Sequence, residues 1–189
     1  MKMDFRILSL LLLFNLIFGC GETKQKTRSE IYSEKTAELI NDLLKEEENQ
    51  ICDCILEPNN QSMAQIYKSE VPAFEFENYI IEKFKLETTA GIDSLYGINE
   101  KLILNPDLIT GGIKFVTQKE YDSIYNKYDF EDAREVLNET YPNLCYFTKP
   151  IFDRDFKNAL FDIHYETSDL WTPPPKVKNI QGVWEYDRN

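Results

Sequence analysis

The chain has 189 residues, of which 21 are basic, 33 are acidic and one is histidine, and its net charge is −12 at pH 7. So acidic a chain is repelled by phosphate backbones and by anionic lipid, which argues against a nucleic-acid partner and against a polybasic membrane patch. Aromatic residues make up 13% of the chain, which favours a folded core over disorder.

The N-terminus has the three parts of a secretory signal. Lys2 and Arg6 make its start basic, an apolar run covers residues 7–18, and the small residue Gly19 precedes Cys20. As a helix, this run of 12 residues at about 1.5 Å each falls short of the roughly 30 Å hydrocarbon core, so it is a poor transmembrane span.

The end of this segment resembles the lipobox of bacterial lipoproteins. Ile17, Gly19 and Cys20 match its pattern, whereas Phe18 is bulkier than the residue usual at that position. The resemblance implies that the signal is cut before Cys20 and that Cys20 is diacylated on sulfur. Two or three acyl chains, at about 0.8 kcal/mol per buried CH₂, make a durable anchor. The alternative is an ordinary signal peptide whose cysteine is incidental.

The lipobox predicts three regions: a signal peptide at 1–19, a lipidated tether at 20–27 and a single α+β domain at 28–189. Removing residues 1–19 leaves 170 residues, with 19 basic and 32 acidic side chains and a net charge of −13. This length suffices for one domain with a genuine core. We therefore expect an acidic body in the bacterial cell envelope, attached to a membrane through the lipid on Cys20. The expected membrane is the outer membrane, with the body facing the periplasm or the cell surface.

Three cysteines remain beyond Cys20, which in an oxidising compartment predicts one disulfide and one thiol. Cys52 and Cys54 lie in the short apolar segment 51–56, which is typical of a strand. Side chains two apart on a strand share a face at roughly 7 Å, too far for a relaxed disulfide between them. The sequence therefore predicts a bridge from either Cys52 or Cys54 to Cys145.

A capping box opens the first predicted helix. Thr27 and Glu30 are spaced so that hydroxyl and carboxylate each bond a backbone N–H at the helix start. Apolar residues then recur at helical spacing to about Glu48, which predicts an amphipathic helix. The acidic run at 46–48 lies at the negative end of the helix dipole, so we expect this end to fray.

Two shorter helices are predicted in the second half of the chain. Thr117 and Glu120 form another capping box, which opens a helix through Tyr125. Asp129 caps a further helix that Pro142 ends. The residues of this helix expected to face the core are Phe130, Ala133, Val136, Leu137 and Tyr141. Between the first helix and these two, residues 79–84 have helical spacing and residues 113–116 read as a strand.

The C-terminal part is rich in strand patterns. We predict strands at 144–148, 159–166 and 182–187, with a turn at 153–158 and a stiff proline loop at 172–175. The predicted fold class is therefore α+β, with an N-terminal amphipathic helix and short helices packed on an antiparallel β-sheet.

A second resemblance lies in the last 40 residues or so. The segments Lys149-Pro150-Ile151-Phe152-Asp153, Asn158-Ala159-Leu160-Phe161 and Gly182-Val183-Trp184-Glu185 resemble a pattern common in small Bacteroidetes (flavobacterial-type) lipoproteins of unknown function. The chain departs from this pattern before the tryptophan, where it has Leu170-Trp171 and a proline run. That family has no established activity, so the resemblance implies only a cellular address and a fold.

Metal and catalytic sites are poorly supported. Cys52, Cys54, Cys145 and His164 could in principle hold zinc, but a one-residue gap between thiolates fits such a site badly, and we expect no metal and no cofactor. His164 shares a strand face with Asp162, on what we expect to be a half-exposed sheet surface, and no nucleophile motif accompanies it. We assign no catalytic residue.

Three aromatic residues near the proline loop are candidates for ligand binding. Trp171, Trp184 and Tyr186 could line a groove, or could simply pack a sheet edge with large side chains. We expect a non-catalytic lipoprotein that binds a protein or a small ligand. The alternatives are an envelope hydrolase that uses dispersed carboxylates, and an acidic immunity or inhibitor protein that neutralises a basic toxin.

Overall fold

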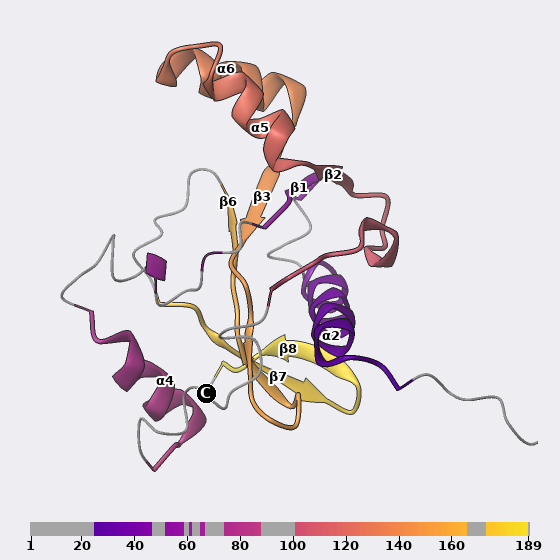
Figure 1. The fold of residues 1–189 in the computed structure, drawn as a ribbon, viewed down its shortest axis with the longest axis vertical. Coiled ribbons are helices and arrows are strands. Elements are labelled where there is room, and N and C mark those ends of the chain that lie inside the picture. Colours follow the sequence, from indigo (N-terminus) through magenta and orange to yellow (C-terminus); the bar gives the residue numbers. More distant parts are fainter. Residues whose placement is uncertain are drawn as a thin grey trace, which may run out of the picture.

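The structure, a computed structural model, describes residues 25–46, 52–58, 61, 65–66, 74–87, 101–165 and 173–188. These residues form an α+β fold, as the sequence predicts (Figure 1). The helices are α2 (Arg28–Leu43), α4 (Phe76–Phe84), α5 (Gln118–Tyr125), α6 (Phe130–Thr140) and the 3₁₀ turn η3 (Pro106–Leu108). The strands are β1 (Cys54–Leu56), β2 (Lys114–Val116), β3 (Leu144–Phe147), β4 (Ile151–Phe152), β5 (Asn158–Leu160), β6 (Ile163–Tyr165), β7 (Lys176–Ile180) and β8 (Val183–Tyr186).

The helix starts follow the local sequence closely. Thr27 caps α2 and Thr117 caps α5, each in a reciprocal capping box with the glutamate three residues on, and Asp129 caps α6. Helix α2 ends at Leu43, earlier than predicted. Its last turn holds no basic side chain that could interact favourably with the helix dipole, and an acidic run follows.

The strands form two four-stranded sheets, in the orders β2-β1-β3-β6 and β4-β5-β7-β8. In the first sheet, β1 runs parallel to both β2 and β3, and only β3 and β6 are antiparallel. The predicted antiparallel pairing is therefore found for β3 with β6 and throughout the second sheet, whereas β1 pairs in parallel with both of its neighbours. Long connections separate β1 from β2 and β2 from β3, and the second contains α5 and α6, which gives the chain the crossover that parallel pairing needs.

One long hairpin passes from the first sheet into the second. Phe147 pairs with Ile163 in the first sheet, and Ile151 pairs with Leu160 in the second. Between these two pairs, one side of the hairpin has the three residues 148–150 and the other has the two residues 161–162. The first side therefore carries one extra residue, as in a β-bulge. Strands commonly change sheets at such bulged corners. The single strand predicted at 159–166 is for this reason two strands, β5 and β6, in different sheets.

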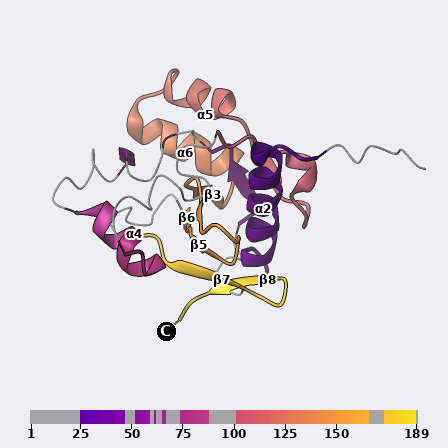
Figure 2. The same cartoon turned by 60° about the horizontal axis from the view of Figure 1, so that its bottom comes forward.

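The apolar face of α2 lies against both sheets. Its fully buried residues Leu39, Ile40 and Leu43 share a core cluster with Cys145 of the first sheet and Trp184 of the second. Figures 1 and 2 both show α2 beside β8. The opposite face of the first sheet is covered by α5 and α6, and α4 packs on the second sheet at β4 and β5.

Helix α6 buries less of its predicted face than expected. Ala133 and Leu137 are buried, and Val136 packs against their cluster. Phe130 is 66% exposed, contrary to the prediction, and is not part of this cluster. Its ring lies against Tyr125, with centroids 6.2 Å apart.

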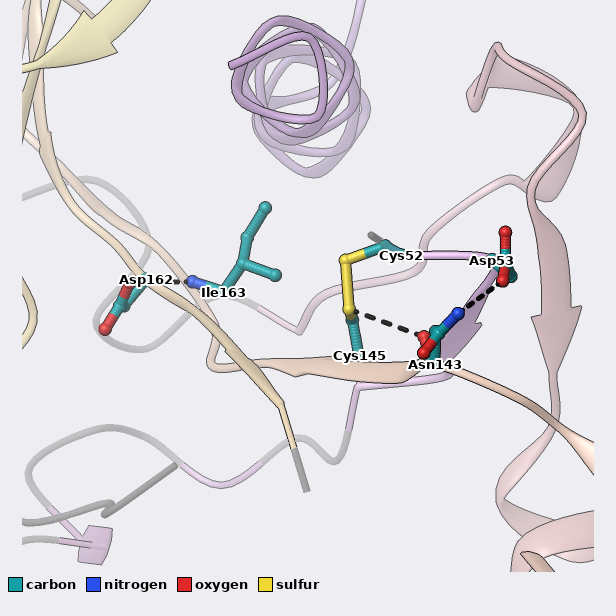
Figure 3. Close-up of a disulfide and its surroundings, with 6 residues drawn as sticks. All are labelled: Cys52, Asp53, Asn143, Cys145, Asp162 and Ile163. Carbon is teal, nitrogen blue, oxygen red and sulfur yellow. Dashed lines mark hydrogen bonds between the residues drawn. A yellow bond between two sulfur atoms is a disulfide. The ribbon is translucent and has the colours of Figure 1, made fainter. Parts of the chain in front are cut away.

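A buried disulfide joins the segment before β1 to β3 (Figure 3). It links Cys52 to Cys145, which are 93 residues apart in sequence and 5.7 Å apart at Cα. Cys52 is 6% exposed and Cys145 is fully buried, beneath α2. This is one of the two pairings that the strand geometry left open, and Cys54 is the free thiol. Burial raises the pKa of the Cys54 thiol.

Cys52 and Cys54 do not share a strand face, contrary to the sequence-based expectation. The chain bends at Asp53, so that Cys52 lies in the cluster beneath α2 while Cys54 lies in the cluster beneath α5 and α6. Two hydrogen bonds hold the bend. The Asp53 carboxylate accepts one from the Asn143 side-chain amide at 2.6 Å, and its carbonyl accepts one from the Lys114 N–H at 3.0 Å.

Removal of the disulfide by Cys52→Ala together with Cys145→Ala should lower the free energy of unfolding by about 2–5 kcal/mol, because the bridge closes a long loop in the unfolded chain. Urea denaturation of the double variant and the parent measures this loss. The control is Cys54→Ala, which removes a buried sulfur but keeps the bridge. An unfolding free energy equal to that of the parent would contradict the bridge.

Candidate functional site

Two of the predicted site residues, Cys20 and Trp171, lie outside the residues that the structure describes. The lipidation of Cys20 and the cut after residue 19 therefore stay predictions. Within the described ranges, no helix is both long and apolar enough to cross a bilayer.

The remaining two aromatic residues of the predicted groove lie in different surroundings. Trp184 is fully buried in the core, where its ring packs on Phe152 with centroids 5.5 Å apart. Its backbone N–H donates to the Asp42 carboxylate of α2 at 3.1 Å. Tyr186 is half-buried and lines a surface pocket. Trp184 is therefore a core residue, and only Tyr186 keeps a place at a candidate site.

This pocket, which we call the hairpin pocket, lies where the β7–β8 hairpin meets the end of α2. It has a volume of about 360 Å³. Its lining residues are Glu46, Lys178, Ile180, Glu185, Tyr186, Asp187 and Arg188. Sequence analysis missed all of these except Tyr186, because residue 46 and the last strands give no local sign that they meet.

Two ion pairs cross the hairpin pocket. The Lys178 ammonium lies 2.7 Å from the Asp187 carboxylate, and the Arg188 guanidinium lies 3.7 Å from the Glu46 carboxylate. Glu185 is exposed and has neither an ion pair nor a hydrogen bond from its side chain to any other described residue. The pocket therefore has three carboxylates and two cations, and Glu185 is the carboxylate that neither cation contacts.

The tip of the same hairpin exposes two apolar side chains. Ile180 and Val183 face each other across β7 and β8 and are 49% and 56% exposed. The residues between them, Gln181 and Gly182, both have positive φ (55° and 94°), as a tight two-residue hairpin turn requires. The turn thus holds an apolar pair on the surface beside the charged pocket.

A second candidate site lies at the corner where the long hairpin changes sheets. His164 is only 8% exposed, so the expectation of a half-exposed sheet surface is wrong. Its Nδ1 lies 3.6 Å from the Asp162 carboxylate, which is an ion-pair distance but longer than a hydrogen bond. Across the sheet, Tyr146 is the direct partner of His164. The hydroxyl of Thr148, at the same corner, is buried without a hydrogen-bond partner among the described residues.

Burial perturbs the titration of this corner. Desolvation raises the pKa of Asp162, while the nearby His164 and a 2.9 Å hydrogen bond from the Ile163 N–H act in the opposite direction. Burial also raises the pKa of Tyr79 of α4, and the carboxylates of Glu82 and Asp162 contribute to that shift. Perturbed carboxyl groups beside a histidine are typical of functional sites, although structural pairs show the same shifts.

The described residues include no cluster of three or more His, Cys, Asp or Glu side chains that could hold a metal ion. Cys52 and Cys145 are bonded to each other beneath α2, so neither offers a thiolate that could bind zinc together with His164. The zinc arrangement that the sequence allowed in principle is therefore not formed by these residues.

Comparison of the chain with protein families, with curated protein sequences and with solved structures gives no match.

Asp162→Asn should raise the free energy of unfolding above that of the parent, and this gain should be larger at pH 7 than at pH 4. The folded-state pKa of Asp162 is raised, so the folded protein holds this proton more tightly than the unfolded chain does. The stabilisation from that proton is present at low pH and is lost as the pH rises through the folded-state pKa. Asparagine stays neutral and keeps an acceptor for Ile163, so it avoids this loss.

Urea denaturation of the Asp162→Asn variant and the parent across this pH range measures the effect. The control is Asp155→Asn, which removes an exposed carboxylate from the β4–β5 turn. A stability difference that shrinks toward neutral pH would contradict the raised pKa of Asp162.

Proposed function

We propose that this protein is a bacterial envelope lipoprotein, of the small flavobacterial type, that is anchored by lipid on Cys20 and binds a partner at the hairpin pocket. The partner is a protein or a small ligand. The observation that carries the binding role is the hairpin pocket itself, a concave charged surface directly beside the exposed pair Ile180 and Val183. Apolar side chains next to a concave polar site are typical of binding surfaces.

Two observations support the cellular address. The lipobox residues Ile17, Gly19 and Cys20 follow a signal-like apolar run. The bridge between Cys52 and Cys145 is of the kind that persists in oxidising compartments such as the periplasm and the cell surface. The acidic body carries a net charge of −13 without residues 1–19, so the lipid supplies the membrane attachment.

An envelope hydrolase is the second candidate, and the ion-pair contact of half-buried Asp162 with buried His164 is the observation that favours it. A carboxylate close to a histidine is part of the arrangement that activates a nucleophile. The binding role is preferred because neither residue lines the hairpin pocket.

Cys20→Ala should abolish lipidation and release the protein from membranes. The intact mass of membrane-extracted parent protein is expected to exceed that of the chain from residue 20 by two or three acyl chains, because the lipobox directs acylation to Cys20. Membrane fractionation and mass spectrometry of parent and variant test this. A mature chain that carries no lipid and still stays with the membrane would overturn the anchor.

A photo-cross-linking residue at Val183 should form adducts with a partner in intact cells, because this position lies opposite Ile180, which lines the hairpin pocket. The matched control is the same residue at Ile103, which is equally apolar and similarly exposed (62%, against 56% for Val183). Adducts are expected at Val183 and not at Ile103. Equal adducts at both positions, or none at Val183, would remove the support for this binding surface.

A further inference from the structure

We infer that the hairpin pocket binds an arginine side chain presented by a basic protein partner, with Glu185 as the carboxylate that receives it. This inference rests on the proposed binding function and names its chemistry.

The charges of the pocket are unevenly paired. Lys178 is the cross-strand neighbour of Glu185, and would be expected to neutralise it. Its ammonium instead lies 2.7 Å from Asp187, which is only 12% exposed at its side chain. Among the described residues, no cation therefore pairs with the exposed Glu185 carboxylate, which stays available for a positive group from a partner.

Exposed apolar side chains lie near the Glu185 carboxylate. Long cationic side chains bury their methylene groups on apolar surface while the charged end stays polar. Ile180, 49% exposed, lines the pocket together with Tyr186, and Val183 lies opposite Ile180 at the hairpin tip. Ile180, Val183 and Glu185 share the outer face of the hairpin, because their register positions differ by even numbers. An arginine stem can therefore lie on the aliphatic pair while its guanidinium reaches Glu185.

Arginine suits this carboxylate better than other charged groups do. The guanidinium is planar and forks onto a carboxylate with two hydrogen bonds, whereas an ammonium group is a compact point charge. An anionic ligand would meet three carboxylates in the pocket. Each of the two cations already has a carboxylate beside it, Asp187 for Lys178 and Glu46 for Arg188. The acidic body also attracts a basic partner from a distance, most strongly at low salt.

The test is an NMR titration of the full mature chain carrying Cys20→Ala, at low ionic strength. The probe is an acetylated and amidated Ala-Arg-Ala peptide, and its neutral counterpart has citrulline in place of arginine. We expect saturable shifts of the backbone amide signals of Ile180, Glu185 and Tyr186 with the arginine peptide. The citrulline peptide should bind roughly tenfold more weakly, since it keeps the shape and loses a charge-assisted hydrogen bond.

Variants separate the pocket from the overall charge of the protein. Glu185→Gln should weaken binding of the arginine peptide roughly tenfold, whereas Glu139→Gln should leave it unchanged. Glu139 is an exposed glutamate of α6, so its substitution changes the net charge equally outside the pocket. Unfolding midpoints of both variants show that each is folded.

Three results would overturn the inference: equal binding of the citrulline peptide, equal weakening by Glu139→Gln, or shifts confined to residues outside the pocket. The proposed binding function fails separately. If adducts form at Val183 in cells while the arginine peptide fails to bind, the pocket has a partner of different chemistry. If both experiments fail, the pocket is not a binding site.

Discussion

The burial of one face of α2 against both sheets is the constraint on which the rest of the structure depends. Leu39, Ile40 and Leu43 are fully buried, and each such side chain contributes about 1.5–3 kcal/mol when it leaves water. Tyr32 of the same helix donates a 2.6 Å hydrogen bond to the Pro150 carbonyl, at the corner where the long hairpin changes sheets. One helix therefore fixes how the two sheets lie relative to each other.

The hairpin pocket is a consequence of this packing. Near the end of α2, the Asp42 carboxylate accepts a hydrogen bond from the backbone N–H of Trp184, which fixes β8 beside the helix. Glu46 follows the helix and pairs with Arg188 beyond the strand. The pocket thus combines Glu46, which follows α2, with residues 132 to 142 positions later in the chain. Its charge pattern depends on the helix and the hairpin meeting at this point.

The position of the pocket also fits the proposed anchor. The chain enters α2 at its N-terminal end, after the region expected to be a lipidated tether. The pocket lies at the other end of the helix, because its lining residue Glu46 follows the last helical residue, Leu43. Because α2 has 16 residues, at about 1.5 Å each these two ends are roughly 24 Å apart. A partner at the pocket would therefore be held away from the point where the tether enters the fold.

The sequence by itself determined the features that depend on neighbouring residues. These are the secretion signal that ends at Cys20, which stays a prediction, and the helix starts at Thr27, Thr117 and Asp129, where one side chain bonds the backbone three residues on. Only the tertiary structure decided which strands pair, that β1 is parallel to its neighbours, and that the 159–166 segment divides between two sheets. It also decided that Cys52 bonds Cys145, because the bend at Asp53 turns Cys52 toward α2 and leaves Cys54 on the other face. These choices, like the meeting of Glu46 and Glu185 at one pocket, arise from contacts between residues far apart in the chain, which local patterns of polarity and spacing do not encode.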